Sequence, residues 1–260
     1  MHVLLVGLGN MGMKYLAKLE ELEELPVLCD VDPYKNVKKY PFYCHFGDIK
    51  EDIKRAIVAV NPEHHVEIAG EFLEKGIPVL LEKPPAKTST QFRQIAQNEG
   101  LEVSEIELYS FPVKNFPRDL EIESIHIERL NRGRGYINPL WDLAWHDMYI
   151  LQYLFGGLEL ENFSEGEVWE LTGRAGGVPF KLRVAWEYKG DVVRKWTVKT
   201  SQGEVVMDLL KEEIAYGGKV LKKKEGDKLR EMVDDFLKGR RREGSALRAL
   251  RNLELLESLL

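Results

Sequence analysis

The sequence predicts an α/β chain of two domains: an N-terminal Rossmann domain with a doubly wound parallel sheet, and a C-terminal α+β domain with an open, mostly antiparallel sheet. In the first half, short aliphatic runs alternate with helical patterns, and the first run leads into a Gly-x-Gly-x-x-Gly turn. In the second half, apolar and other residues alternate over 180–188, which is typical of a sheet with one buried face. We expect domains at residues 1–118 and 119–260, with closing helices in 227–260 that can pack back on the first.

Composition narrows the classes of function. The chain has 260 residues and a formal net charge of −6, so no nucleic-acid partner is expected. No signal peptide is recognisable, and no apolar run approaches the roughly 18 residues that span a bilayer. Cys29 and Cys44 have no metal or redox spacing and suit a reducing compartment. We therefore expect a cytoplasmic protein without a membrane partner or a metal site.

The glycine turn predicts a dinucleotide site. A strand at residues 2–6 runs into Gly-Leu-Gly-Asn-Met-Gly, and a helix with apolar Met13, Leu16, Leu19 and Leu22 follows. The first glycine allows a tight turn, the second lets the backbone approach a pyrophosphate, and the third lets helix and strand pack closely. N–H groups at the helix N-terminus can bind the phosphates. The candidate cofactor-binding residues here are Gly7, Gly9, Asn10, Met11 and Gly12.

Asp30 is the candidate for reading the cofactor's ribose. It ends a second strand at residues 27–29, about 20 residues beyond the glycines, where an acid accepts hydrogen bonds from the ribose hydroxyls. A carboxylate there repels a 2′-phosphate, so NAD is favoured over NADP, although Lys35 lies close enough to weaken the preference. The alternative is that Asp30 only starts a turn with Asp32 and Pro33.

Further strands and helices complete the first domain. Strands are expected at 43–46 and 56–60, and Asn61 and Pro62 open the next helix. Thr88 caps a helix at 91–98.

His64 and His65, in the first turn of the helix that Asn61 opens, suggest a metal site at first sight. Adjacent helix positions point about 100° apart and no third ligand lies nearby, so capping and packing roles are favoured.

Residues 79–84 read Val-Leu-Leu-Glu-Lys-Pro and combine a buried strand with a lysine at its end. Parallel strands covered on both faces are continuous aliphatic runs, and Pro84 ends the pairing. In open α/β sheets, ligands bind beyond the carboxyl ends of the strands. Lys83 is therefore a candidate catalytic residue and, with Glu82, a candidate cofactor contact. The alternative is a solvated charge before a turn.

The second half combines strands with one strong helix. Strands are expected at 125–129, 168–172, 180–188, 192–200 and 204–209. A helix at 139–155 has Asn138 as its cap and Gly156 at its end. Two closing helices are separated near 239–244.

The central helix carries an acid and a histidine. Asp142 and His146 are four residues apart and share one face of an α-helix, where the acid can orient the imidazole. A surface ion pair is the alternative. Trp141, Trp145 and Tyr149 form an aromatic stripe, which is core or, alternatively, a surface for sugar stacking.

Together, the glycine turn, Glu82-Lys83-Pro84 and the Asp142-to-His146 helix resemble the Gfo/Idh/MocA oxidoreductases nearly end to end. Residues 61–69 and the closing helices match the same family. The resemblance implies an NAD-dependent dehydrogenase that acts on a hydroxyl carbon of a sugar, polyol or nucleotide sugar. Lys83 would contact the nicotinamide ribose and the reacting hydroxyl, His146 would be the general base, and Asp142 would position substrate or histidine.

Other expectations follow from the same resemblance. Asn61 and Pro62 would contact the cofactor, Trp145 the substrate, and the Lys83–Pro84 peptide would be cis.

Two departures from the family concern the substrate pocket. Residues 104–118 lack the Asn/Tyr-Arg-Phe segment and the long helix that usually follow the sixth strand, and the second domain is short. The pocket is then more open, or it is filled by Arg132, Arg134 or Tyr136, whose arginines can bind a phosphate or a carboxylate. A flexible surface loop is the alternative.

Other functions stay open. The shortened segment also suits a non-catalytic NAD-binding regulator or scaffold, and an imine or bilin-type reductase on the same fold would not need His146. Because a broad sheet with one open face needs a cover, we expect a homodimer or homotetramer through the C-terminal sheet.

Overall fold

The computed structural model describes residues 2–135, 137–222, 226–240 and 242–259. The chain forms two compact units. The first contains residues 1–104 and 229–253, and the second contains residues 105–228 and 254–260. Each unit has its own sheet, one parallel and one mostly antiparallel, so the predicted fold class is confirmed.

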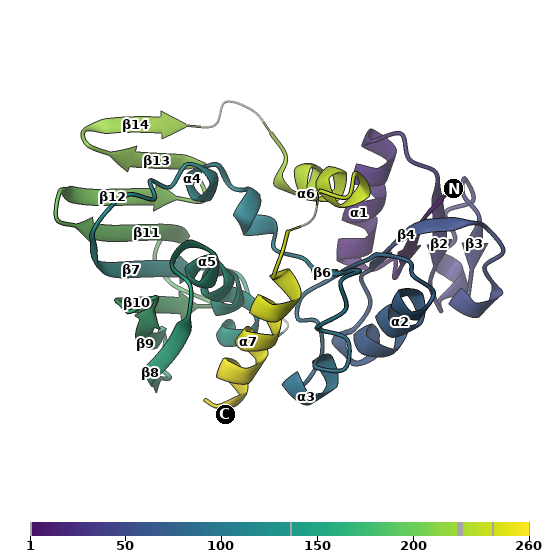
Figure 1. Ribbon diagram of the computed structural model, residues 1–260, viewed down its shortest axis with the longest axis horizontal. Helices are drawn as coiled ribbons and strands as arrows, with labels where there is room; N and C mark the ends of the chain where they lie inside the picture. The colour runs from purple at the N-terminus through teal and green to yellow at the C-terminus, as the bar shows by residue number, and fades with distance from the viewer. Residues whose placement is uncertain (1, 136, 223–225, 241, 260) are drawn as a thin grey trace. The chain divides into compact units, whose positions relative to one another are not determined.

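The first unit is built on a six-stranded parallel sheet in the order β3-β2-β1-β4-β5-β6. Figure 1 labels β2, β3, β4 and β6 of this sheet. The order reverses between β1 and β4, and ligands of such sheets bind at this switch point, beyond the carboxyl ends of the strands. The bounds are β1 (His2–Val6), β2 (Pro26–Cys29), β3 (Phe42–Tyr43), β4 (Ile53–Val58), β5 (Val79–Leu81) and β6 (Leu101–Val103).

Helices cover both faces of this sheet. Figure 1 places α1 (Asn10–Glu21) and α6 (Lys228–Leu237) on one face, and α2 (Pro62–Glu74) and α3 (Ser89–Phe92) on the other. The last helix is α7 (Ser245–Glu257). At its first residue, Ser245 Oγ accepts a hydrogen bond from the Val103 backbone N–H (3.1 Å). The pair of closing helices is therefore as predicted.

Three local predictions for the first unit need correction. Met13 is 46% exposed, because α1 buries Gly12, Tyr15, Leu16 and Leu19 instead. The third strand ends at Tyr43, since Phe46 already belongs to a 3-10 turn. Thr88 Oγ1 caps α3 as expected, but the helix stops at Phe92. Beyond it, N–H groups such as that of Ile95 bond three residues back, as in tighter turns.

His65 is a buried histidine of α2. Its ring is 1% exposed, and Nδ1 lies 2.9 Å from the carbonyl oxygen of Pro84. Burial lowers the pKa of His65 to about 4. The neighbouring His64 is exposed beside Glu63, so the two rings have different surroundings. Within the described ranges, no group of three or more metal-ligating side chains is found.

Acid should destabilise the first unit through His65. The ring charges near pH 6.5 in an unfolded chain but at about 4 here, so the unfolded state binds more protons between these values. Stability is therefore lost as the pH falls through this window, by about 2 kcal/mol between pH 7 and pH 5. Urea unfolding at both pH values should show this loss in the wild type and in the His64→Gln control, and a much smaller loss in His65→Gln. Equal losses in all three proteins would contradict the assignment.

The second unit is built on an eight-stranded sheet in the order β14-β13-β12-β11-β7-β10-β9-β8. Neighbouring strands are antiparallel except β7 and β10, which are parallel. The predicted strands correspond to β7, β9, β10, β11 and β12, whereas β8, β13 and β14 were missed. The bounds are β7 (Ile122–Leu130), β8 (Leu158–Ser164), β9 (Trp169–Ala175), β10 (Val178–Ala185), β11 (Val193–Thr200), β12 (Gly203–Asp208), β13 (Glu213–Tyr216) and β14 (Lys219–Lys222).

The central helix lies on one face of this sheet (Figure 1). It consists of a π-helical turn at Leu140–Ala144 followed by α5 (Trp145–Phe155), and Asn138 Oδ1 accepts the Trp141 N–H (3.2 Å) as the predicted cap. The strand predicted to reach residue 188 ends at Ala185. Glu187 takes a positive φ of 53°, which turns the chain away from the sheet.

The opposite face of the sheet carries charged side chains that pair with one another across the strands. Arg183 bonds Glu128 (2.6 Å) and Glu170 (3.2 Å), and Lys181 also bonds Glu170 (2.9 Å). These are partly exposed pairs between neighbouring strands, which contribute little each to stability. The open face of the sheet is therefore polar around β7, β9 and β10.

A second set of ion pairs is buried between α5 and the sheet. The Arg129 guanidinium, 2% exposed, bonds both carboxylate oxygens of Asp147 at 2.6 and 3.1 Å. Trp196 Nε1 donates to the same carboxylate (2.9 Å). Glu107 accepts from Arg129 (3.3 Å) and from Lys228 (2.7 Å). Burial opposes the Glu107 charge, but the two cations outweigh it and lower the pKa of that carboxyl. We call Glu107, Arg129, Asp147 and Lys228 the buried ion cluster.

Removing the central cation should destabilise the second unit strongly. Arg129→Met leaves the buried Asp147 and Glu107 carboxylates without their main partner, and breaking such a pair costs about 3–5 kcal/mol. Arg183→Met, the matched control on the open face, should change stability by about 1 kcal/mol or less. Denaturant midpoints measure both. A similar small loss in the two variants would argue against the importance of the buried ion cluster.

No helix in the described part of the chain is both long enough and apolar enough to span a bilayer.

Candidate functional site

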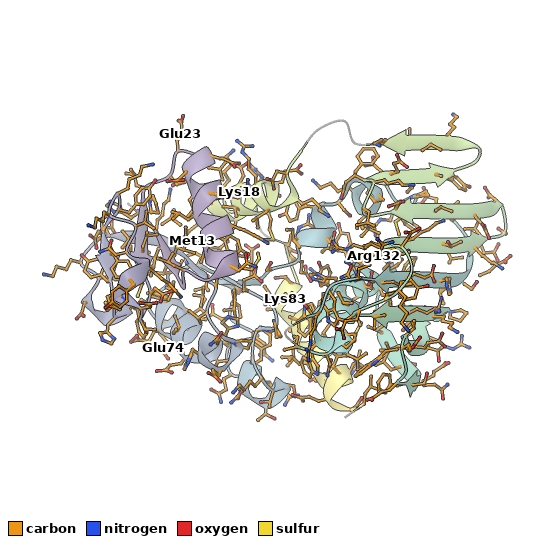
Figure 2. All side chains as sticks on the ribbon, turned by 180° about the vertical axis from the view of Figure 1, so that it is seen from behind. Met13, Lys18, Glu23, Glu74, Lys83 and Arg132 are labelled. Carbon is orange, nitrogen blue, oxygen red and sulfur yellow. The ribbon has the colours of Figure 1, made fainter. Side chains whose placement is uncertain are left out.

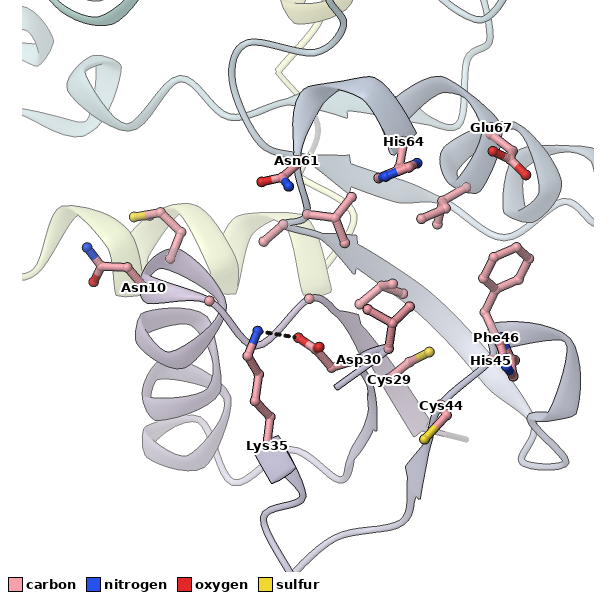
Figure 3. Close-up of a pocket in the computed structure, with 18 residues that line it drawn as sticks. Asn10, Cys29, Asp30, Lys35, Cys44, His45, Phe46, Asn61, His64 and Glu67 are labelled. Atoms are coloured by element: carbon pink, nitrogen blue, oxygen red, sulfur yellow. Dashed lines mark hydrogen bonds and ion pairs between the residues drawn. The ribbon is translucent and has the colours of Figure 1, made fainter. Parts of the chain in front are cut away.

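The first unit contains a pocket of about 530 Å³ at the switch point of its sheet (Figure 3). Its walls come from the turn after β1, the end of β2 and the start of α2. The lining residues include Gly7, Gly9, Asn10, Met11, Asp30 and Asn61 from the predicted cofactor set. The other predicted cofactor contacts, Gly12, Pro62, Glu82 and Lys83, are not among the described lining residues.

Each glycine of the turn has a distinct role in this geometry. Gly7 has a φ of +92°, and a Cβ there would lie 2.4 Å from the Ala59 oxygen. A Cβ on Gly12 would lie 1.9 Å from the Gly7 oxygen, so Gly12 allows the turn and α1 to pack closely. A Cβ on Gly9 would meet nothing within 4 Å, which leaves open space beside the backbone where α1 begins. In the part of the chain that the structure describes, no side chain caps the first turn of α1. These residues fit a bound pyrophosphate.

Asp30 is held firmly at the edge of the pocket. Oδ2 accepts the Leu8 N–H (2.6 Å), and Oδ1 accepts the Asp32 N–H (3.0 Å). Lys35 Nζ reaches the same carboxylate at 3.1 Å, as the dashed line in Figure 3 shows. Partial burial opposes the charge, but these three hydrogen bonds outweigh it and lower the pKa of Asp30. An ionised acid therefore stands in the pocket wall with a cation beside it.

The strand end at Glu82 and Lys83 is fixed from two sides. Glu82 Oε1 accepts the Tyr15 hydroxyl (2.5 Å), and Oε2 accepts the Lys83 N–H (3.0 Å). On the other side, His65 contacts the carbonyl oxygen of Pro84. The Lys83–Pro84 peptide is cis, as predicted. The carboxylate of Glu82 thus holds the backbone that carries Lys83.

Tyr15 was missed by the sequence reasoning. Burial and the Glu82 charge raise the pKa of its hydroxyl well above the ordinary value, so it stays a donor to Glu82. The only signal in the sequence was its place on the inner face of α1, where an aromatic residue suggests packing alone.

His146, in the first turn of α5, is tied to the same helix. Its Nδ1 lies 3.0 Å from the Tyr149 hydroxyl oxygen, and the two rings meet edge to face. The same oxygen accepts the Glu107 backbone N–H (3.0 Å). Asp142 lies in the π-helical turn before α5. That Asp142 and His146 share one face of the helix stays a prediction.

The aromatic stripe is mainly core. Trp145 and Tyr149 are each 1% exposed, and Trp141 stacks on Trp145 with ring centroids 6.4 Å apart. The burial of Trp145 fits the core alternative rather than a substrate contact.

The loop after β7 holds the two candidate substrate arginines, of which Figure 2 labels Arg132. Arg132 Nε donates to the Gly190 oxygen (2.9 Å), and its Nη2 bonds Asp191 (2.7 Å). Arg134 is exposed, and Tyr136 lies outside the described residues. The Arg132 guanidinium is therefore tied to the loop after β10 but reaches solvent.

The candidate residues fall into two sets. The glycine turn, Asp30, Glu82 and Lys83 belong to the first unit, with the pocket. Asp142, His146 and the two arginines belong to the second unit, with the buried ion cluster.

Comparison with solved structures shows the fold at low sequence identity. UDP-N-acetylglucosamine 3-dehydrogenase GnnA from Acidithiobacillus ferrooxidans matches with a TM-score of 0.84 and 15% identity, covering 99% of this chain and 96% of that chain. A dehydrogenase (MviM) from Clostridium difficile matches at 0.85 and 16%, covering 100% and 98%. GenD2 from gentamicin A biosynthesis, in complex with NAD, matches at 0.80 and 18%, covering 99% and 92%.

Comparison with curated protein sequences found no match. A family model, GFO_IDH_MocA, matches residues 1–100 and is described as an oxidoreductase family with an NAD-binding Rossmann fold. The match covers the glycine turn, Asp30 and Lys83. The resemblance inferred from the sequence is thus confirmed for residues 1–100, which match the NAD-binding Rossmann fold of this oxidoreductase family.

Proposed function

We propose that this chain is a dehydrogenase that transfers a hydride between NAD and a hydroxyl-bearing carbon of a sugar, polyol or nucleotide sugar. The observation that carries the proposal is the pocket of about 530 Å³, whose wall combines the open backbone at Gly9 with the ionised Asp30. It lies in the part of the chain that matches an NAD-binding oxidoreductase family.

The residues of the pocket fit NAD. The backbone at Gly9 and the first turn of α1 would bind the pyrophosphate, and Asp30 would accept hydrogen bonds from the adenosine ribose. Bound NAD supplies the carbon that accepts the hydride. Lys35, paired with Asp30, offsets part of the repulsion of a 2′-phosphate, so NADP is disfavoured less than Asp30 alone would imply.

The substrate class rests on the relatives and on the second unit. Among the structural neighbours, one is named a UDP-N-acetylglucosamine 3-dehydrogenase and another belongs to gentamicin A biosynthesis. The exposed arginines of the loop after β7, Arg132 and Arg134, are suited to a phosphate or carboxylate of such a substrate. We therefore favour a nucleotide-linked or acidic sugar.

Lys83 and His146 would handle the proton of the reacting hydroxyl, and Asp142 would position the substrate. The support is the rigid mounting of both residues. Glu82 holds the Lys83 backbone, and Tyr149 holds the His146 ring. A fixed backbone at Lys83 and a fixed ring at His146 lower the entropy that must be lost before a proton can move.

We also propose that the protein is cytoplasmic and forms a homodimer or homotetramer through the open sheet face. The polar ion pairs on that face would make such an interface sensitive to salt. Light scattering at micromolar concentration tests the assembly, and a monomer would refute it.

Removing the charge of Asp30 should weaken NAD binding selectively. In Asp30→Asn the side chain keeps one oxygen but loses the charge that favours ribose over a 2′-phosphate, so NAD affinity should fall about tenfold. The NADP affinity should fall less or rise. Calorimetric titration of both cofactors measures the ratio. Asp32→Asn, two residues further along, is the control, and an unchanged NAD to NADP ratio in Asp30→Asn would refute the ribose role.

Lys83→Met should abolish turnover while NAD still binds. The substitution keeps most of the length of the side chain but removes the amine that would exchange the proton, so turnover should fall by about a hundredfold or more. NAD reduction is followed over a panel of sugars and nucleotide sugars, and NAD binding is measured by calorimetry. Lys87→Met, an exposed lysine paired with Glu63, should keep full activity.

Two results would decide against this account. Full turnover in Lys83→Met would rule out the role of Lys83. Tight NAD binding by the wild type without turnover across the panel would favour the non-catalytic regulator or scaffold.

A further inference from the structure

The hydrogen bonds around Tyr149 determine which nitrogen of His146 carries the hydrogen. His146 Nδ1 lies 3.0 Å from the Tyr149 hydroxyl oxygen, which is well within hydrogen-bond distance. A neutral imidazole has one nitrogen that donates and one that accepts. Whether Nδ1 donates or accepts towards Tyr149 therefore determines whether Nε2 of the neutral ring accepts or donates.

The surroundings of the Tyr149 hydroxyl favour its role as the hydrogen-bond donor towards His146. Its side chain is 1% exposed, and its oxygen already accepts the backbone N–H of Glu107 at 3.0 Å. The phenol has a single hydrogen of its own to donate. Among the described residues, His146 Nδ1 is the only acceptor within hydrogen-bond distance of the Tyr149 hydroxyl.

The phenol also keeps its hydrogen. Burial, and then the negative charge of Glu107, raises the pKa of Tyr149 well above its ordinary value. Glu107 itself cannot move away, because Arg129 and Lys228 of the buried ion cluster hold its carboxylate. A buried hydroxyl that fails to donate its hydrogen is energetically unfavourable, by about 1–3 kcal/mol.

We infer that Tyr149 donates its hydroxyl hydrogen to His146 Nδ1 and so holds neutral His146 with its own hydrogen on Nε2. In this form Nε2 donates a hydrogen bond to the substrate oxygen and has no lone pair to accept a proton. Tyr149 is a positioning residue, and the proton of the hydroxyl goes to Lys83. This inference rests on the proposed function and assigns the separate roles of its two residues.

The proposed step is the oxidation of a hydroxyl-bearing carbon. The O–H bond of the substrate would break and its proton would go to the amine nitrogen of Lys83. The C–H bond would break and its hydrogen would leave with both electrons, for which bound NAD would be the acceptor. The substrate becomes a carbonyl compound and is oxidised by two electrons. His146 Nε2–H bonds the oxygen throughout, so it stabilises the negative charge that develops there. The resemblance to the family alone would instead make His146 the base.

The state of the wild-type ring tests the inference without substrate or cofactor. Nitrogen chemical shifts of the His146 imidazole, in the full-length protein at pH 7.5, distinguish a protonated from an unprotonated ring nitrogen. We expect an unprotonated Nδ1 and a protonated Nε2. A protonated Nδ1 would overturn the inference.

A matched pair of variants tests the part played by Tyr149. Tyr149→Phe should move the His146 Nδ1 shift, because it removes the hydroxyl that donates to this nitrogen. Tyr153→Phe, one turn further along α5 on a partly exposed ring, should not. Thermal unfolding of both variants establishes that they fold. An unchanged Nδ1 shift in folded Tyr149→Phe would overturn the inference.

A glutamine at position 146 separates a hydrogen-bond donor from a base. The amide of glutamine donates a hydrogen bond but does not take up a proton at neutral pH. With the panel substrate that the wild type turns over, His146→Gln should keep kcat within about tenfold of the wild type, whereas His146→Ala should lose a hundredfold or more. Equal losses in the two variants would overturn the donor role. Failure of the proposed function would show differently, as a wild type without turnover.

Discussion

A charge buried inside a protein must have a partner, and this constraint determines how candidate residues in each of the two units are held. Glu82 is buried at the end of β5, so its two oxygens take hydrogens from Tyr15 and from the Lys83 backbone. Arg129 is buried beneath α5, so Asp147 and Glu107 surround it. In each unit the network that satisfies the buried charge also holds a candidate catalytic residue in place.

The two networks hold their residues in different ways. Glu82 fixes the backbone of Lys83 through the Lys83 N–H. Tyr149 fixes a ring, and because a phenol has one hydrogen, it also selects the protonation of that ring. The division of labour between Lys83 and His146 that we propose follows from this difference. An alkyl amine can take up a proton, whereas a ring held with its hydrogen on Nε2 can only donate a hydrogen bond there.

Local patterns allowed most of the fold to be predicted. The glycine turn is recognisable by the spacing of its glycines. The strands of the first unit are recognisable as continuous aliphatic runs, and the long strand of the second unit by its alternation of apolar and other residues. Strand β14 was missed because all four of its residues are exposed, so no apolar pattern marks it. The π-helical turn around Asp142 was missed because its sequence is compatible with a regular helix.

The candidate site was predictable only in part, because a local pattern does not show which distant residues meet in the fold. Lys83 and Asp30 stand at strand ends, where the position alone suggests chemistry, and the pocket lies at Asp30. Tyr15 and Tyr149 stand on the inner faces of helices, where an aromatic residue predicts packing. Their hydroxyl groups matter only because Glu82, Glu107 and His146 meet them, and Glu82 and Glu107 come from distant parts of the chain.

The central claim, hydride transfer from a hydroxyl carbon to NAD, can be tested by isotope labelling. The enzyme would be incubated with NAD and a fully carbon-deuterated form of the panel sugar that it oxidises, and the reduced cofactor would be analysed by mass spectrometry and proton NMR. The account predicts one deuterium atom at C4 of the nicotinamide ring in every NADH formed. NADH that carries no deuterium would contradict it.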